Sequence, residues 1–156
     1  MTKGWSWIVC VGVCLLGGGL SGLSVVSAMR EWYPTVIKPD WTPPNHVFGP
    51  VWSALYMCMG TSVWLALRRL GGTWKNGPIG WFALQLALNW AWTPLFFGLH
   101  WIGGALIEII LLWLAIAATI KSFLPLSRPA AYLLIPYLGW VSAATALTYS
   151  IWRLNP

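Results

Sequence analysis

The segment that decides the fold is WTPPNHVFGPVW, residues 41–52, which leads directly into a long apolar run. Proline fixes φ and has no N–H group, so the pair Pro43-Pro44 cannot lie inside a helix and predicts a stiff cap before one. Pro50 is expected in the first turn of the following helix, where a missing N–H costs little. The sequence therefore predicts a rigid entrance to a helix that begins near residue 47.

Aromatic side chains continue from this entrance along the predicted helix. Phe48, Trp52 and Tyr56 recur at every fourth position, which places them on one helical face. A rigid aromatic entrance that leads onto an aromatic face is suited to a flat, apolar ligand.

The composition indicates a membrane protein. Of the 156 residues, 58% are hydrophobic and 8% are charged, whereas a soluble domain carries about 25% charged residues. Mean hydropathy is +0.70. The sequence has 14 tryptophans, and those in the middle of apolar runs are not explained by the enrichment of tryptophan at membrane interfaces. We therefore expect the lipid bilayer as a partner and a second role for the tryptophans.

Five apolar runs are long enough to cross about 30 Å of hydrocarbon as helices. They cover residues 5–29, 47–70, 79–97, 102–123 and 130–152. The whole protein, 1–156, is thus predicted to be a single all-α membrane domain with five transmembrane helices in one bundle. Only residues 30–46 form a long connection, called here the first loop. It is rich in aromatic residues and proline, so we expect it to fold over one end of the bundle.

The distribution of charge gives the expected orientation and argues against nucleic-acid binding. Nine Lys and Arg oppose three Asp and Glu, for a net charge of +6. Nearly all these charges fall between the apolar runs, which favours topology and lipid-headgroup roles over nucleic-acid binding. Six basic residues lie on the N-terminal side and three on the first-loop side. This bias favours a cytoplasmic N-terminus in a bacterial inner membrane.

The cysteines and histidines do not predict a metal centre. All three cysteines lie inside apolar runs, so no disulfide framework is expected. Cys10 and Cys14 are four residues apart, but no histidine or acid neighbours them, and we interpret them as small packing residues. His46 and His100 fall at predicted helix ends, where interface histidines are favoured over haem or metal ligands.

The third run has two distinct faces. One face carries Gln85, Asn89, Trp92 and Phe96. Amides in a membrane span are costly unless they meet a partner or line a cavity. The opposite face carries Ala83, Ala87 and Ala91. Small residues at this spacing let two helices approach closely, which predicts a homodimer. The alternative is that the alanines pack inside the monomer.

Residues of unusual chemistry lie at matching depth. At about 1.5 Å per residue, they lie roughly 8–14 Å in from the first-loop side. They are Trp52, Tyr56, Asn89, Trp92, Glu108 and Ala144. Glu108 is the one acid within a run, so it faces the interior or is neutral, and its alternative role is a structural hydrogen bond. The fifth run has a stripe from Tyr137 through Trp140 to Leu147, which suits either the core or a pocket.

Several motifs along the sequence resemble those of a known family. The motifs are WY at 32–33, KPxWxPP at 38–44, GPVWxxxY at 49–56, QLALNWxW at 85–92, FFG at 96–98, and PYLxW from 136 with WR at 152–153. Together they resemble the translocator protein family, also called tryptophan-rich sensory proteins or peripheral-type benzodiazepine receptors. The resemblance extends over almost all of the sequence.

The resemblance implies a five-helix, usually homodimeric membrane protein that binds porphyrins, sterols and benzodiazepine-site compounds under the first loop. The family's pocket tryptophans, asparagine and small residue correspond to Trp52, Trp140, Asn89 and Ala144. The full predicted ligand site is Tyr33, Trp41, Pro44, Phe48, Trp52, Tyr56, Asn89, Trp92, Glu108, Trp140, Ala144 and Leu147. The membrane is expected to be a bacterial cell membrane or, depending on the organism, the mitochondrial outer membrane.

The last predicted helix contains a proposed sterol-binding pattern. It consists of Leu147, Tyr149 and Arg153, a weak motif that many membrane helices match. Thr148 stands where many members have asparagine, and Gly104 stands where animal members have tryptophan. These departures favour porphyrin over sterol as the expected ligand.

The leading hypothesis is a receptor or carrier that requires no cofactor and takes a porphyrin, protoporphyrin IX or haem, as ligand. The rival is an enzyme that degrades porphyrin in light, in which Trp52 and Trp140 would be the reactive residues. A stress sensor that acts through ligand binding is a further alternative. We predict no conventional catalytic residues, because no nucleophile–base pair is visible.

Overall fold

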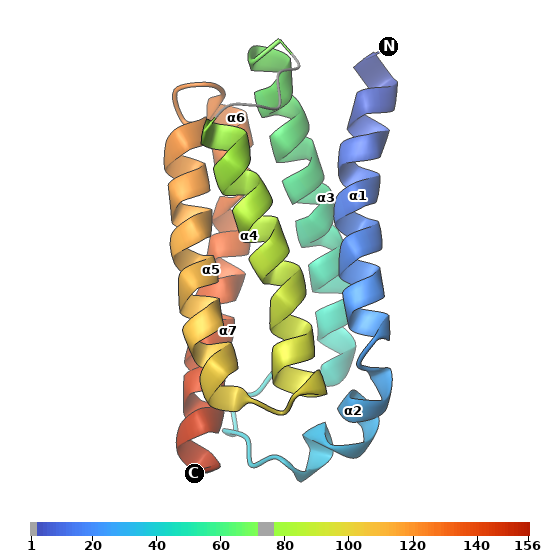
Figure 1. Cartoon of the computed structure of the whole chain (residues 1–156), viewed down its shortest axis with the longest axis vertical. Helices are drawn as coiled ribbons and strands as arrows, with labels where there is room; N and C mark the ends of the chain where they lie inside the picture. The colour runs from blue at the N-terminus through green and yellow to red at the C-terminus, as the bar shows by residue number, and fades with distance from the viewer. Residues whose placement is uncertain (1–2, 72–76) are drawn as a thin grey trace.

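Within residues 3–71 and 77–156, which the computed structural model describes, the regular elements are all helices. The long ones are α1 (Lys3–Leu23), α3 (Asn45–Arg69), α4 (Gly77–Thr93), α5 (Ile102–Phe123) and α7 (Ile135–Leu154). The short ones are α2 (Val26–Glu31), η1 (Tyr33–Thr35), η2 (Pro94–Gly98) and α6 (Arg128–Tyr132). The long helices stand side by side in one bundle, and the termini lie at opposite ends (Figure 1). The predicted all-α class is confirmed.

Several described helices are long and apolar enough to cross a bilayer. By length and composition these are α3, α5 and the segment Arg128–Leu154, which combines α6 and α7. A fourth candidate joins Trp7–Leu23 to Val26–Thr35 across a bend of 56°. Helix α4 is shorter, at 17 residues, but it continues directly into η2. The protein is a helical membrane protein.

Prolines divide two of the expected runs. Pro136 has no N–H with which to bond the carbonyl of Tyr132, so α6 ends there and α7 restarts at Ile135. Pro94 likewise cannot bond the carbonyl of Trp90, and the α-helix gives way to η2, a π-helical turn. The hydroxyl of Ser21 on α1 instead donates to the Trp90 carbonyl, with a donor–acceptor distance of 2.7 Å.

Two boundaries differ from the sequence expectation. The run 5–29 is not one helix, because the backbone bends between α1 and α2 at Ser24 and Val25, next to a Ser-Gly pair typical of kinks. Helix α3 begins at Asn45, directly after Pro44, whose backbone is extended with ψ of 144°. Pro50 therefore lies in the second turn of α3, and its placement in the first turn was wrong.

Close packing of α1 against α3 depends on a glycine. A Cβ atom added to Gly60 would lie 2.4 Å from Cα of Val11, so a larger side chain would meet backbone and force the helices apart. A side-chain hydrogen bond from Trp7 to Thr61 (3.1 Å) also joins α1 to α3. Two others join α3 to α6, through Ser62 and the Ala130 carbonyl (2.6 Å), and α5 to α7, through Trp113 and Ser142 (2.8 Å).

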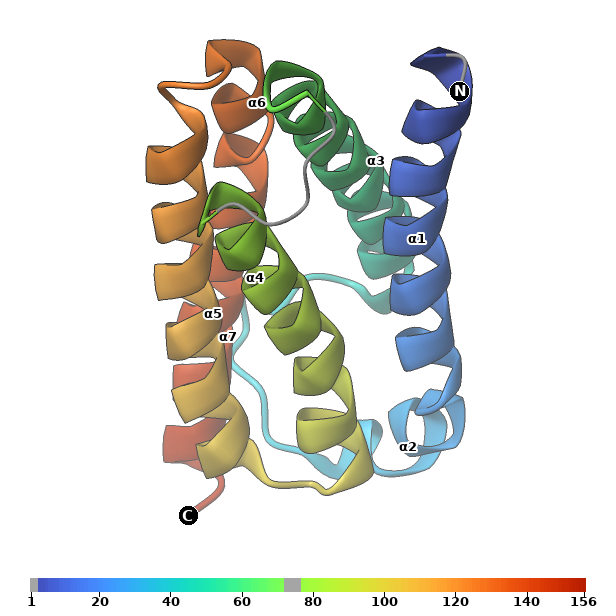
Figure 2. The same ribbon diagram turned by 45° about the horizontal axis from the view of Figure 1, so that its top comes forward.

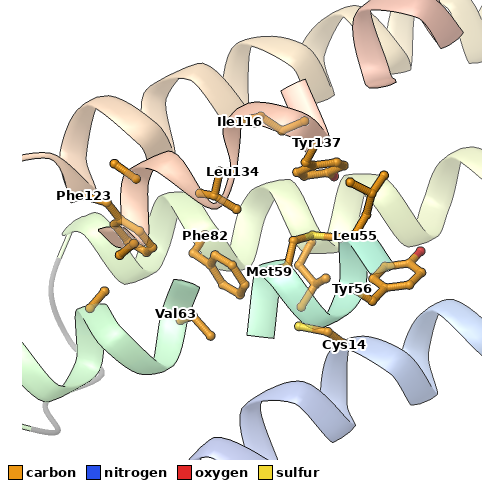
Figure 3. Close-up of a cluster of buried hydrophobic side chains, with 14 of the residues drawn as sticks. Cys14, Leu55, Tyr56, Met59, Val63, Phe82, Ile116, Phe123, Leu134 and Tyr137 are labelled. Atoms are coloured by element: carbon orange, nitrogen blue, oxygen red, sulfur yellow. The ribbon is translucent and has the colours of Figure 1, made fainter. Parts of the chain in front are cut away.

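Buried side chains from each long helix meet inside the bundle. Figure 3 shows Met59 of α3 lying between Cys14 of α1 and the residues of α7. Phe82 of α4 stacks on Phe123 of α5, with ring centroids 6.1 Å apart. Outside the bundle, large apolar residues are exposed, which suits contact with lipid. They include Leu16, Leu20, Ile107, Leu111 and Leu114.

Candidate functional site

A cavity of about 340 Å³ lies inside the bundle, in the half nearest the first loop. Each of the five long helices contributes residues to its wall. Nine of the twelve predicted ligand-site residues line it: Tyr33, Phe48, Trp52, Tyr56, Asn89, Trp92, Trp140, Ala144 and Leu147. The residues that the sequence placed at matching depth thus line one cavity.

Three predicted residues lie outside this lining. Trp41 is on the surface of the first loop with 53% of its area exposed, and Pro44 is exposed as the cap of α3. Glu108 is buried on α5, at 8% exposure, next to the lining residue Ile109. Among the described residues, neither carboxylate oxygen of Glu108 has a hydrogen-bond partner.

Aromatic rings form the wall between α3 and α7. The ring of Phe48 meets that of Trp140 edge to face at 5.8 Å, and Trp52 meets Tyr137 at 6.2 Å. Trp52 also lies 5.6 Å from Tyr56, one turn further along α3. Because bulky rings rather than small residues fill this contact, the two helix backbones cannot close together. The wall therefore offers π-faces at both Trp52 and Trp140.

A buried series of hydrogen bonds holds the inner end of the cavity. Tyr56 donates to Oδ1 of Asn89 at 2.6 Å, and Nδ2 of Asn89 donates to the hydroxyl of Tyr137 at 2.9 Å. The amide thus uses one acceptor and one donor, which fixes its orientation. Tyr56 and Asn89 line the cavity, whereas Tyr137 is fully buried behind them. These bonds tie α3, α4 and α7 together at one level.

Helix α1 supplies a wall that the sequence reasoning missed. Leu15, Gly18, Gly19 and Gly22 line the cavity, together with Met29 of α2. A Cβ atom on Gly18 would lie 2.1 Å from the ring of Tyr56, so the ring lies directly on the α1 backbone. In the sequence this wall is marked only by the glycine run at 17–19, which has no polar or aromatic side chain to indicate a binding site.

Aromatic rings of the short helices η1 and η2, together with Trp92 of α4, close the end of the cavity. Trp92 stacks on Phe96 with centroids 4.9 Å apart, and Tyr33 meets Phe97 at 5.3 Å. Beyond them, Trp32 lies parallel to His100 at 4.1 Å. His100 has a φ of 54°, in the left-handed region, where the backbone turns from η2 towards α5.

Two side chains fix the first loop over this end. Nζ of Lys38 donates to the carbonyls of Tyr33 and Val36, each at 2.8 Å. Asn155, after the end of α7, accepts from the N–H of Ile37 at 3.1 Å and donates to its carbonyl at 2.9 Å. Figures 1 and 2 show the loop passing the C-terminal end of α7 before it returns to α3. The loop is therefore anchored both to itself and to the last helix.

Two lining tryptophans have unused hydrogen-bond donors. Nε1 of Trp92 and Nε1 of Trp140 are buried, and neither has a partner among the described residues. Buried polar groups in proteins are usually hydrogen-bonded, so an unpaired donor in a cavity wall is available to a ligand. The otherwise apolar wall thus has two points at which it can bind an acceptor atom.

Most of the other predicted features lie away from the cavity. In the sterol pattern, Leu147 lines the cavity, whereas Tyr149 and Arg153 are exposed. The alanine face of α4, Ala83, Ala87 and Ala91, is exposed on the outside of the bundle. Cys10 and Cys14 are buried and unpaired.

Comparison with known proteins agrees with the motifs. The family model described as TspO/MBR family matches residues 10–153. The translocator protein of Sus scrofa is 42% identical over 154 residues, which cover 96% of this chain and 91% of the relative. The tryptophan-rich protein TspO of Chlorobaculum tepidum is 40% identical over 153 residues, 95% of this chain and 94% of the relative. The tryptophan-rich sensory protein of Cereibacter sphaeroides is 40% identical over 126 residues, 80% of this protein and 77% of the relative. The protein therefore belongs to the TspO/MBR family.

Proposed function

We propose that this protein is an integral membrane receptor or carrier that binds porphyrins and other flat, hydrophobic ligands in the cavity under the first loop. Benzodiazepine-site compounds and sterols are further ligand classes within the proposal. The observation that carries it is the pair Trp52 and Trp140, which line one cavity from two different helices. Indole rings have wide π-faces and favour stacking on a flat conjugated ligand.

The size and charge of the cavity constrain the bound state. About 340 Å³ is near the lower end of the range of roughly 300–1,000 Å³ for ligand pockets. A small flat ligand therefore fits inside this volume, whereas a tetrapyrrole is expected to extend beyond it. None of the lining residues is charged. The carboxylates of a porphyrin are thus expected outside the cavity, because burying an unpaired charge is costly.

Dark titration with protoporphyrin IX tests the proposal. In Trp52→Leu and Trp140→Leu, the loss of one stacked indole is expected to cost about 1 kcal/mol or more, roughly a five-fold rise in Kd. Trp81→Leu is the matched control, because Trp81 is 45% exposed and does not line the cavity. Unchanged affinity in both cavity variants, or an equal loss in the control, would overturn the assignment.

A second candidate is light-dependent degradation of the bound porphyrin. It is favoured by the same two indoles, since an indole that lies beside an excited macrocycle is readily oxidised. Phenylalanine keeps a π-face but is harder to oxidise, so Trp52→Phe and Trp140→Phe should slow bleaching in light more than they weaken binding in the dark. Equal rates of bleaching in the parent and both variants would rule out this enzymatic role for the two indoles, and only the receptor or carrier role would remain.

A further inference from the structure

A second pocket lies at the end of the bundle opposite the first loop. Its volume is about 600 Å³, and it lies between the last turn of α3 and the connection from α5 to α6. Figure 2 shows the end of α3 beside α6 there, and the buried hydrogen bond between Ser62 and the Ala130 carbonyl joins the two elements. No residue of this pocket belongs to the lining of the cavity under the first loop.

Three exposed arginines from two segments line this pocket. Arg68 and Arg69 come from α3, and Arg128 comes from the start of α6. The guanidinium of Arg68 lies 4.9 Å from the ring centroid of Trp64, a cation–π contact that limits its movement. Within the described residues, none of the three arginines forms an ion pair with a carboxylate.

The protein has no acid near enough to neutralise these arginines. Its three acidic residues are Glu31, Asp40 and Glu108. Glu31 ends α2 and Asp40 is in the first loop, both at the far end of the bundle, while Glu108 is buried on α5. The carboxyl terminus is also at the far end (Figure 1). Three positive charges in one pocket repel each other, so an anion supplied from outside would stabilise this end.

The chemistry of the pocket selects the kind of anion. Arginine presents a planar fork of donors that matches phosphate oxygens, and three forks suit a group with several of them. Ser127 adds a hydroxyl to the same lining, while Leu65, Leu124 and Leu126 add apolar walls. A phosphate whose molecule continues into an acyl tail would use both parts. Basic pockets between membrane helices bind anionic lipid headgroups in this way.

We propose that the pocket formed by Arg68, Arg69 and Arg128 is a phosphate-binding site, separate from the ligand cavity. The phosphate is presented either by the headgroup of an anionic phospholipid or by a soluble phosphate compound. Both sources share the same contact with the guanidinium groups. The apolar walls distinguish them, because a lipid gains from these walls and inorganic phosphate does not.

Short-chain lipids added to the full-length protein in non-ionic detergent test the proposal. The probes are dioctanoyl phosphatidylglycerol, dioctanoyl phosphatidylcholine and inorganic phosphate, each titrated by calorimetry. The test variant is Arg69→Gln with Arg128→Gln, and the matched control is Arg30→Gln with Arg153→Gln, two arginines at the other end. We expect phosphatidylglycerol to bind at least ten-fold more tightly than phosphatidylcholine, and the test variant to lose at least ten-fold in affinity.

The individual outcomes separate the two sources. If inorganic phosphate binds or competes at millimolar concentration, the soluble source is supported, and if only phosphatidylglycerol binds, the lipid source is supported. Arg69→Lys with Arg128→Lys keeps the charge but loses the fork, so it should give intermediate affinity and also serves if the glutamine variant does not fold. The proposal would be overturned if the two lipids bound with equal affinity and inorganic phosphate neither bound nor competed. An equal loss of affinity in the Arg30 and Arg153 control would also overturn it.

Discussion

Replacing Asn89 with leucine should destabilise the bundle, because it leaves the buried hydroxyl of Tyr137 without a hydrogen-bond partner. Leucine has the same number and branching of side-chain heavy atoms but cannot pair with either tyrosine hydroxyl, so both hydrogen bonds, at 2.6 and 2.9 Å, are lost. Tyr56 lines the cavity, so its hydroxyl remains accessible to water or to a polar atom of a ligand. Tyr137 is fully buried and does not line the cavity, so its hydroxyl is left without a partner.

The unpaired Tyr137 hydroxyl sets the size of the effect. An unsatisfied buried polar group costs about 1–3 kcal/mol, and polar interactions in membrane bundles tend towards the lower part of such ranges. We therefore expect Asn89→Leu to lower the free energy of unfolding by about 1 kcal/mol. In a protein of this length that corresponds to a fall in Tm of roughly 2–4 °C.

A second substitution separates this cause from a general packing defect. Tyr137→Phe removes the hydroxyl, so the double variant Asn89→Leu, Tyr137→Phe should recover most of the lost stability. The assay is thermal unfolding in detergent, followed by tryptophan fluorescence, on the parent, both single variants and the double variant. If the double variant is as unstable as the sum of the two single variants, these hydrogen bonds are not the source of the effect.

Three further predictions concern packing, assembly and the loop. Gly60→Ala should lower Tm, because its Cβ meets the α1 backbone, whereas Gly80→Ala, with open space around it, should not. If the predicted homodimer forms through the alanine face of α4, Ala83→Phe with Ala87→Phe should shift it to monomer in size-exclusion chromatography with ligand binding kept. An unchanged dimer would place the interface elsewhere. Asn155→Ala should release the first loop and speed both association and dissociation of protoporphyrin in stopped-flow measurements. Unaltered rates would show that this loop contact does not control entry.

Much of this fold is predictable from local sequence chemistry. Apolar runs longer than the hydrocarbon thickness leave few alternatives to membrane helices, because backbone groups in lipid must be satisfied within the segment. The same reasoning brings Trp52, Asn89 and Ala144 to one level from rise per residue alone, and the three line one cavity. The depth of a residue is set by the rise of its own helix, so it can be predicted without knowing how the helices pack.

Features that depend on contacts between distant segments are not predictable in this way. The pairing of Asn155 with Ile37 joins residues 118 positions apart, and nothing near either residue marks it. The contact of Gly18 with Tyr56 depends on how closely α1 approaches α3. Glu108 shows where the depth argument ends. The sequence places this residue at the correct depth, but it does not distinguish a position that lines the cavity from a buried position beside it.

The most direct test of the cavity as the ligand site is a pair of substitutions one residue apart. Ala144 lines the cavity, whereas Ala143 is exposed on the outer face of α7. The measurement is the Kd of protoporphyrin IX in the dark for Ala144→Trp and Ala143→Trp. Filling the cavity with an indole in Ala144→Trp should abolish binding, and the same indole in Ala143→Trp should leave the Kd within about two-fold of the parent value, a free-energy change of about 0.4 kcal/mol. Full affinity in Ala144→Trp would contradict the account, because the ligand would then bind elsewhere.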